Sequence, residues 1–125
     1  MVRGIGVDIM EISRIRQAMD RLGDRFLERV FTGQEIDYCK SRQNIHQHFA
    51  ARFAAKEAVS KAISLGWGKD FAWKNVEVTN DPSGQPRITL HGRLREMLTA
   101  CNIHLTISHA ENHVVAMVLI EEDPK

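Results

Sequence analysis

One segment of this 125-residue chain, residues 53–62, places a carboxylate and an ammonium group one helical turn apart. Drawn as a helix, the segment and the turn before it have one face made of six alanines: Ala50, Ala51, Ala54, Ala55, Ala58 and Ala62. Glu57 and Lys61 lie at the margin of this face. Their spacing is that of a helix ion pair worth about 0.2–0.5 kcal/mol. A carboxylate that borders a packing face is half-buried and needs a partner, so a bound cation is the second interpretation.

A second carboxylate, Asp8, follows a predicted N-terminal strand that has one bare side. That side carries Gly4 and Gly6, and it is matched in shape by the alanine face, so packing the two together would bring Asp8 toward Glu57. Two carboxylates make a sparse oxygen site of the kind that Mg²⁺ uses with phosphorylated substrates. The pattern of residues 8–11 also predicts a helix capping box, which explains Asp8 without a metal.

The remaining elements follow from hydrophobic periodicity and turn residues. We expect a strand at 2–7, a helix that ends at Gly23, helices at 32–40, 46–64 and 92–101, and strands at 76–79, 87–91, 104–109 and 114–121. The last strand is apolar on both faces, so helices or another subunit should cover both of its sides. The pattern predicts an α+β fold with a mostly antiparallel sheet, formed by one domain at residues 1–125.

Composition excludes several classes of protein. The net charge of +1 argues against a general nucleic-acid-binding protein, and no apolar stretch approaches the roughly 18 residues of a membrane span. Asp8 interrupts the apolar run that a secretory signal would need. Cys39 and Cys101 have neither metal-ligand nor disulfide-framework spacing. We therefore expect a soluble protein of the reducing cytoplasm.

An arginine face is predicted on the first helix, opposite its apolar stripe. It carries Arg14, Arg21 and Arg25. Such a face is usually only solvated. The alternative is a docking surface for an acidic partner, because Ala18 and Met10 leave apolar ground for contact between and beside the arginines. Both interpretations stay open at this point.

Three motifs stand in an order and spacing that match a known family: residues 6–11 (GVDIME), 52–62 (RFAAKEAVSKA) and 106–109 (TISH). Together they closely resemble the bacterial holo-[acyl-carrier-protein] synthases, the short, trimeric 4′-phosphopantetheinyl transferases. The resemblance spans essentially the whole chain. It implies transfer of the 4′-phosphopantetheine moiety of coenzyme A to a serine of acyl carrier protein in fatty acid biosynthesis, with release of adenosine 3′,5′-bisphosphate. It also implies a homotrimer with its sites at subunit interfaces.

The same resemblance assigns roles to individual residues. Asp8 and Glu57 take the positions of Mg²⁺ ligands, Lys61 stands beside the departing phosphate, and Glu57, directly or through a water that it polarises, is the expected acceptor of the serine proton. The positions that match coenzyme A-binding residues are Arg52, Lys61, Gly66, Gly68, Ser108 and His109. Because the family docks the acidic helix of the carrier protein on its first helix, the resemblance favours the docking interpretation for Arg14 and Arg21.

Two rival classes remain on the sequence alone. One is a non-catalytic trimeric module that binds acidic helices through the arginine face and uses Asp8 and Glu57 only as cap and salt bridge. The other is a Mg²⁺-dependent phosphohydrolase that cleaves the same kind of pyrophosphate. Incubation of a carrier protein with coenzyme A and Mg²⁺ separates all three classes: a phosphopantetheinyl gain in the mass of the carrier indicates the transferase, cleavage of coenzyme A without that gain indicates the hydrolase, and neither change indicates the module.

Overall fold

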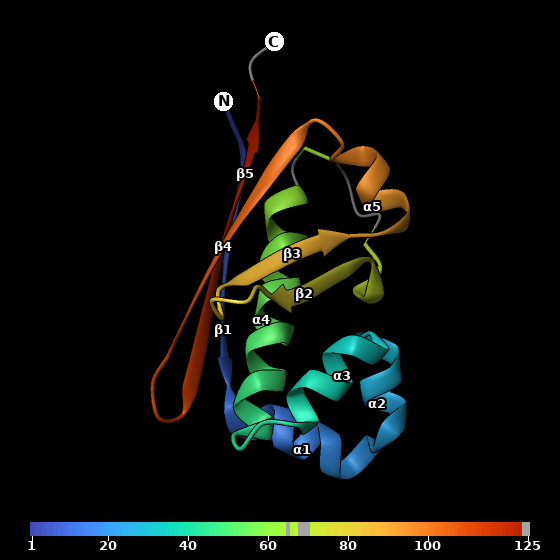
Figure 1. Ribbon diagram of the computed structural model, residues 1–125, viewed down its shortest axis with the longest axis vertical. Coiled ribbons are helices and arrows are strands. Elements are labelled where there is room, and N and C mark those ends of the chain that lie inside the picture. Colours follow the sequence, from blue (N-terminus) through green and yellow to red (C-terminus); the bar gives the residue numbers. More distant parts are fainter. Residues whose placement is uncertain (65, 68–70, 124–125) are drawn as a thin grey trace.

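Helix α4 (Ile45–Ile63) lies along the inner face of a three-stranded sheet and forms the centre of the molecule (Figure 1). The computed structural model describes residues 1–64, 66–67 and 71–123. The sheet has the strand order β1-β5-β4 and is antiparallel throughout, with β1 (Val2–Glu11), β4 (Cys101–His109) and β5 (His113–Glu122). The α+β fold with antiparallel pairing that the sequence predicted is confirmed. No helix of the described residues is both long and apolar enough to span a bilayer.

The other elements cover the opposite side of α4. At its N-terminal end, the lower end in Figure 1, lie α1 (Ile12–Leu22), α2 (Asp24–Val30) and α3 (Gly33–Lys40). Farther along α4 lie the short 3₁₀ helix η1 (Trp73–Asn75), the hairpin of β2 (Val76–Asn80) and β3 (Pro86–Leu90), and α5 (Gly92–Met97). The core is the apolar layer between α4, the inner face of the sheet and this second group.

Strand β1 and helix α4 approach each other backbone to backbone. A Cβ atom built on Gly4 would lie 2.3 Å from the carbonyl oxygen of Ala62, and one on Gly6 would lie 2.0 Å from that of Ala58. Neither distance is compatible with a side chain, so both positions require glycine. The contact predicted between the bare side of the strand and the alanine face is confirmed.

Strand β1 is longer than predicted, and this overturns the capping interpretation of Asp8. Its ladder with β5 continues to the pair Glu11–His113, and α1 begins only at Ile12. Glu11 is therefore the N-cap residue, and it makes no side-chain cap hydrogen bond. Asp8 lies within the strand, opposite Ala116, where its side chain points toward α4. Pairing between distant strands has overridden a local capping pattern.

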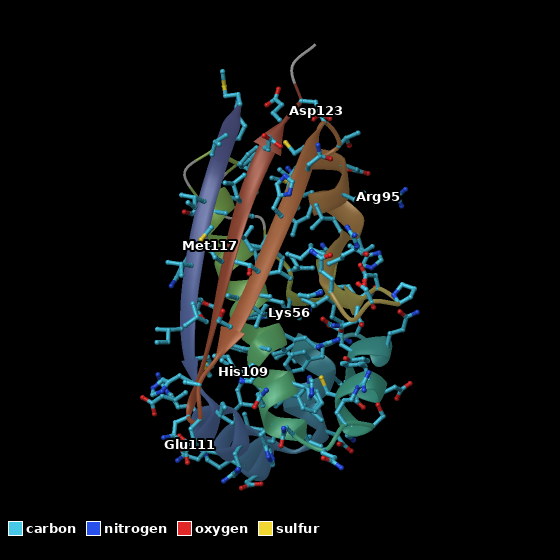
Figure 2. All side chains as sticks on the ribbon, turned by 60° about the vertical axis from the view of Figure 1, so that its left-hand side comes forward. Lys56, Arg95, His109, Glu111, Met117 and Asp123 are labelled. Atoms are coloured by element: carbon cyan, nitrogen blue, oxygen red, sulfur yellow. The ribbon has the colours of Figure 1, made fainter. Side chains whose placement is uncertain are left out.

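Among the described residues, strand β5 is covered on its inner side only. Its alternate residues Val114, Ala116, Val118 and Ile120 are buried against α4. On the other side the sheet presents the apolar residues of what we call the outer face: Ile5, Val7, Ile9 and Met117. Figure 2 shows Met117 on the side of the sheet away from α4. The prediction that both sides of the last strand are covered therefore holds for the inner side, and for the outer side it stays a prediction.

Other elements also differ from the prediction. Helix α2 was not predicted, because its seven residues contain only the short apolar repeat that buries Leu27 and Val30. Helix α5 ends at Met97, and β4 begins at Cys101 because that residue already pairs with Glu122.

The predicted capping box of α3 is confirmed. The hydroxyl of Thr32 accepts a hydrogen bond from the backbone N–H of Glu35, and the side chain of Glu35 accepts one from the backbone N–H of Thr32.

Candidate functional site

Asp8, Glu57 and Lys61 meet where the contact between β1 and α4 is closest. Asp8 is the second residue after Gly6, and Glu57 precedes Ala58, the residue whose carbonyl faces Gly6. The ammonium group of Lys61 lies 3.0 Å from Asp8 Oδ1 and donates a hydrogen bond to the carbonyl oxygen of Val7 at 3.1 Å. The side chain of Lys61 is 54% exposed and that of Asp8 is 14% exposed, so the ammonium group stands at the mouth of the site.

The predicted salt bridge between Glu57 and Lys61 is not the pairing that the fold selects. In the described part of the chain, Lys61 makes its ion pair with Asp8. Burial raises the pKa of Glu57, the negative charge of Asp8 raises it further, and the nearby charge of Lys61 acts in the opposite direction. The site therefore holds two adjacent carboxylates and one ammonium group, which leaves an excess of negative charge near Glu57.

The two carboxylates open into a cleft of about 340 Å³ between β1, α1, α2 and α4. Asp8 and Glu57 form its acidic end, and Arg14 from α1 lies in the same lining. The rest of the cleft is lined by apolar side chains: Ile9, Met10, Ile15, Ala18, Phe26 and Phe53. The cleft thus combines an apolar wall with two carboxylates and one arginine.

A second group of functional side chains surrounds Arg52. This guanidinium is buried, lies over the ring of Tyr38 with its carbon 4.3 Å from the ring centre, and donates from Nη2 to Asn80 Oδ1 at 2.8 Å. Its Nε has no hydrogen-bond partner among the described residues. A buried N–H without a partner is costly, so this atom is a candidate contact for an anionic ligand. Nothing in the spacing of Tyr38 or Asn80 connects them to Arg52, so sequence reasoning missed both.

Positive charge gathers around His48, close to Arg52. Burial lowers the pKa of His48, and the charges of Arg52, Arg42 and His109 lower it further. His109 reaches this group from the end of β4, where its side chain points to the same side of the sheet as Asp8 (Figure 2). The cluster of Arg42, His48, Arg52 and His109 is hereafter called the basic cluster.

The structure brings some of the predicted site residues together and separates others. Asp8, Glu57 and Lys61 form one group. Arg52 belongs to the basic cluster, and five residues of helix place it about 140° around α4 from Glu57. Ser108 is opposite Val115 and points to the outer face of the sheet. Gly66 lies in the turn after α4, and its N–H donates to the carbonyl oxygen of Ile63 at 3.2 Å. Gly68, which was predicted to bind coenzyme A, lies outside the described residues.

Comparison with known proteins defines the class to which this fold and site belong. The family model described as the 4′-phosphopantetheinyl transferase superfamily matches residues 4–118. A curated relative from Koribacter versatilis, named holo-[acyl-carrier-protein] synthase, is 44% identical over 125 residues that cover 98% of this chain and 100% of the relative. The chain belongs to the 4′-phosphopantetheinyl transferase superfamily and, within it, to the holo-[acyl-carrier-protein] synthases.

Solved structures agree with this assignment. A holo-(acyl-carrier-protein) synthase from Bacillus anthracis, in complex with CoA (3′,5′-ADP), has a TM-score of 0.82 at 36% identity, with 98% of this chain and 99% of that chain covered. The Helicobacter pylori holo-[acyl-carrier-protein] synthase, in complex with coenzyme A, has a TM-score of 0.82 at 32% identity, with 94% and 99% covered. The resemblance stated from the three motifs is thereby confirmed.

Proposed function

We propose that this chain transfers 4′-phosphopantetheine from coenzyme A to a serine of apo acyl carrier protein and releases adenosine 3′,5′-bisphosphate. The observation that carries the proposal is the meeting of Asp8, Glu57 and Lys61 at the acidic end of the cleft. Membership of the holo-[acyl-carrier-protein] synthases supports the same reaction. We place the enzyme in the cytoplasm, where fatty acid synthesis uses the holo carrier.

Asp8 and Glu57 would bind Mg²⁺. They fit this ion because both ligands are carboxylate oxygens and because burial, together with the negative charge of Asp8, raises the pKa of Glu57; a bound cation relieves this unfavourable arrangement. When bound, Mg²⁺ supplies positive charge that neutralises the pyrophosphate oxygens of coenzyme A.

The side chains of this site act mainly by position and charge, because the leaving group is already adequate and the serine hydroxyl is a weak nucleophile. Lys61, exposed at the mouth, stabilises the negative charge that grows on the departing adenosine bisphosphate. Glu57, directly or through a water that it polarises, accepts the proton of the serine hydroxyl.

The basic cluster binds a phosphate group of coenzyme A, and the unpartnered Nε of Arg52 is one of its donors. Gly66, Gly68 and Ser108 complete the coenzyme site. Within one chain, the basic cluster and the carboxylates lie on different sides of α4, and Ser108 points to the outer face. This separation supports a coenzyme site completed between subunits of a homotrimer.

The outer face supplies the surface for that assembly. On this face Ile9 is 64% exposed and Val7 is 55% exposed. Such high exposure is unusual for two apolar residues that are neighbours on the same side of a strand. We expect the Val7→Lys variant to dissociate into monomers and to lose most transfer activity, because a charge would be buried at the interface. Sedimentation equilibrium measures the mass. The control is Gln34→Lys, an exposed position on α3. A Val7→Lys trimer would contradict this interface.

Arg14 and Arg21 dock the carrier protein. Arg14 lies beside the apolar wall of the cleft, so an acidic helix bound there would present its serine to Glu57. We expect Arg14→Glu to raise the KM for carrier protein about tenfold, equivalent to about 1.4 kcal/mol, and to leave the KM for coenzyme A unchanged. Salt should weaken carrier binding in the wild type more than in the variant.

The matched control for Arg14→Glu is Arg95→Glu. Arg95 is an exposed arginine on α5, at the end of the molecule farther from α1 (Figure 2). The same charge change there should leave the KM for carrier protein at the wild-type value. Equal effects of the two substitutions would show that overall charge, and not a docking surface, governs binding.

The function itself is tested by incubating the protein with apo carrier protein, coenzyme A and Mg²⁺ and following the mass of the carrier. A gain of one phosphopantetheinyl group supports the proposal. Cleavage of coenzyme A without that gain would instead support a phosphohydrolase. If neither change occurs, the chain is a binding module.

A further inference from the structure

An ion pair that the transfer reaction does not use lies inside the protein, one residue away from Glu57. The ammonium group of Lys56 lies 2.8 Å from Glu35 Oε1, and both side chains are completely buried. Figure 2 shows Lys56 in the interior, on the inner side of the sheet. Because neither group reaches the cleft, the pair takes no direct part in chemistry, and its cost of desolvation calls for another explanation.

The pair connects three elements through hydrogen bonds. Lys56 Nζ donates to the backbone carbonyl oxygen of Trp73 at 3.0 Å and to that of Val76. Glu35 accepts from the backbone N–H groups of Thr32 at 2.9 Å and Val78 at 2.8 Å. Helix α4 is thus tied to the start of α3 and to η1 and β2. Such a fully satisfied buried network holds its partners in one arrangement.

One of these hydrogen bonds, from Lys56 to Trp73, connects the network to the cleft. The ring of Trp73 stacks on that of Phe53, with ring centres 5.1 Å apart and an angle of 27° between the planes. Phe53 in turn lines the apolar wall of the cleft that ends at Glu57. The carbonyl held by Lys56 belongs to the same residue whose ring supports this wall from behind. A displaced Trp73 would leave Phe53 without its support.

We propose that Lys56 is a positioning residue for phosphopantetheinyl transfer: by fixing the backbone of Trp73 and Val76, it keeps Trp73 stacked behind Phe53 and so maintains the cleft wall on which the carrier protein presents its serine to Glu57. The inference rests on the proposed function and deepens it. Glu35 holds the ammonium group in place through their ion pair, so it is the second residue of this positioning network.

The test is the double variant Lys56→Met/Glu35→Gln, which removes both charges together and avoids a buried unpaired carboxylate. Its activity is measured where it is fully folded. We expect kcat/KM for carrier protein to fall about tenfold, chiefly through KM, because Phe53 loses its support. Glu35→Gln alone keeps the lysine but leaves its buried ammonium group without a counter-charge, so it should lower kcat/KM for carrier protein in the same direction and by less. The control for stability is Leu98→Ala, a buried substitution near α5 that should stay fully active when folded.

A second readout, the fluorescence of Trp73, reports directly on the cleft wall. In a Trp67→Phe background Trp73 is the remaining tryptophan, and acrylamide should quench it more strongly in the double variant than in the parent. This readout needs no transfer activity, so it separates a failure of the inference from a failure of the proposed function. If the double variant does not fold, Trp73→Leu must reproduce the loss of kcat/KM. Wild-type kinetics in the folded double variant or in Trp73→Leu, or unchanged quenching, would overturn the proposal.

Discussion

Replacement of Glu57 by Gln is expected to lower the rate of phosphopantetheinyl transfer by roughly 10²–10⁴-fold. The amide keeps the size of the side chain but removes one of the two carboxylates that would bind Mg²⁺, together with the expected acceptor of the serine proton. Carrier mass, followed by mass spectrometry under single-turnover conditions, gives the rate. The control is Glu28→Gln, an exposed glutamate on α2. Wild-type transfer by Glu57→Gln would end the assignment of the site.

The same variant should be more stable than the wild type at neutral pH when no divalent cation is present. The pKa of Glu57 is raised in the folded protein by burial and by Asp8. A carboxyl group with a raised native pKa releases its proton more readily in the unfolded state, so its charge lowers the free energy of unfolding above that pKa. The stabilising effect of Glu57→Gln should therefore shrink as the pH falls through the native pKa. Thermal unfolding across a pH series measures it, and a difference that grows toward acid pH would contradict this account.

Gly6→Ala is expected to cause the largest loss of folding stability among Gly→Ala substitutions at the described glycines. The new Cβ would lie 2.0 Å from the carbonyl oxygen of Ala58, which belongs to a helix backbone and not to a flexible side chain. Strand and helix must therefore separate, at a cost of about 3 kcal/mol and a fall in Tm of roughly 10 °C. Because Asp8 and Glu57 lie on the two separating elements, the residual activity of folded protein should fall as well.

The control for Gly6→Ala is Gly33→Ala. Gly33 opens α3, and a Cβ placed there meets no atom within 4 Å. Its Tm should stay close to that of the wild type. Equal losses at the two positions would mean that glycine itself, and not the close approach of β1 to α4, determines the effect.

Sequence reasoning succeeded where one local pattern determined one contact. The glycines of β1 and the alanines of α4 have no other good partner than each other, so their packing and the meeting of Asp8 with Glu57 were predictable. The capping box at Thr32 was predictable for the same reason, because every group that it needs lies within four residues.

It failed where a distant partner decided between two local possibilities. Asp8 fits a capping pattern, yet the pairing of β1 with β5 extends the strand past it. Lys61 has a glutamate one turn away, yet Asp8 from the other element is its partner. The contacts of Arg52 with Tyr38 and Asn80 depend on how α3 and β2 pack on α4, and no spacing in the chain encodes that packing.

The absence of side chains between β1 and α4 has a consequence for protein engineering. The contact of the two main chains at Gly6 and Ala58 sets the distance between the backbones that carry Asp8 and Glu57. Extensive redesign of the outer face or of α1 should therefore leave the dimensions of the acidic site intact. The same contact makes the site a poor target for gradual adjustment to a larger ion, because a side chain added at Gly4 or Gly6 would collide with the backbone of α4.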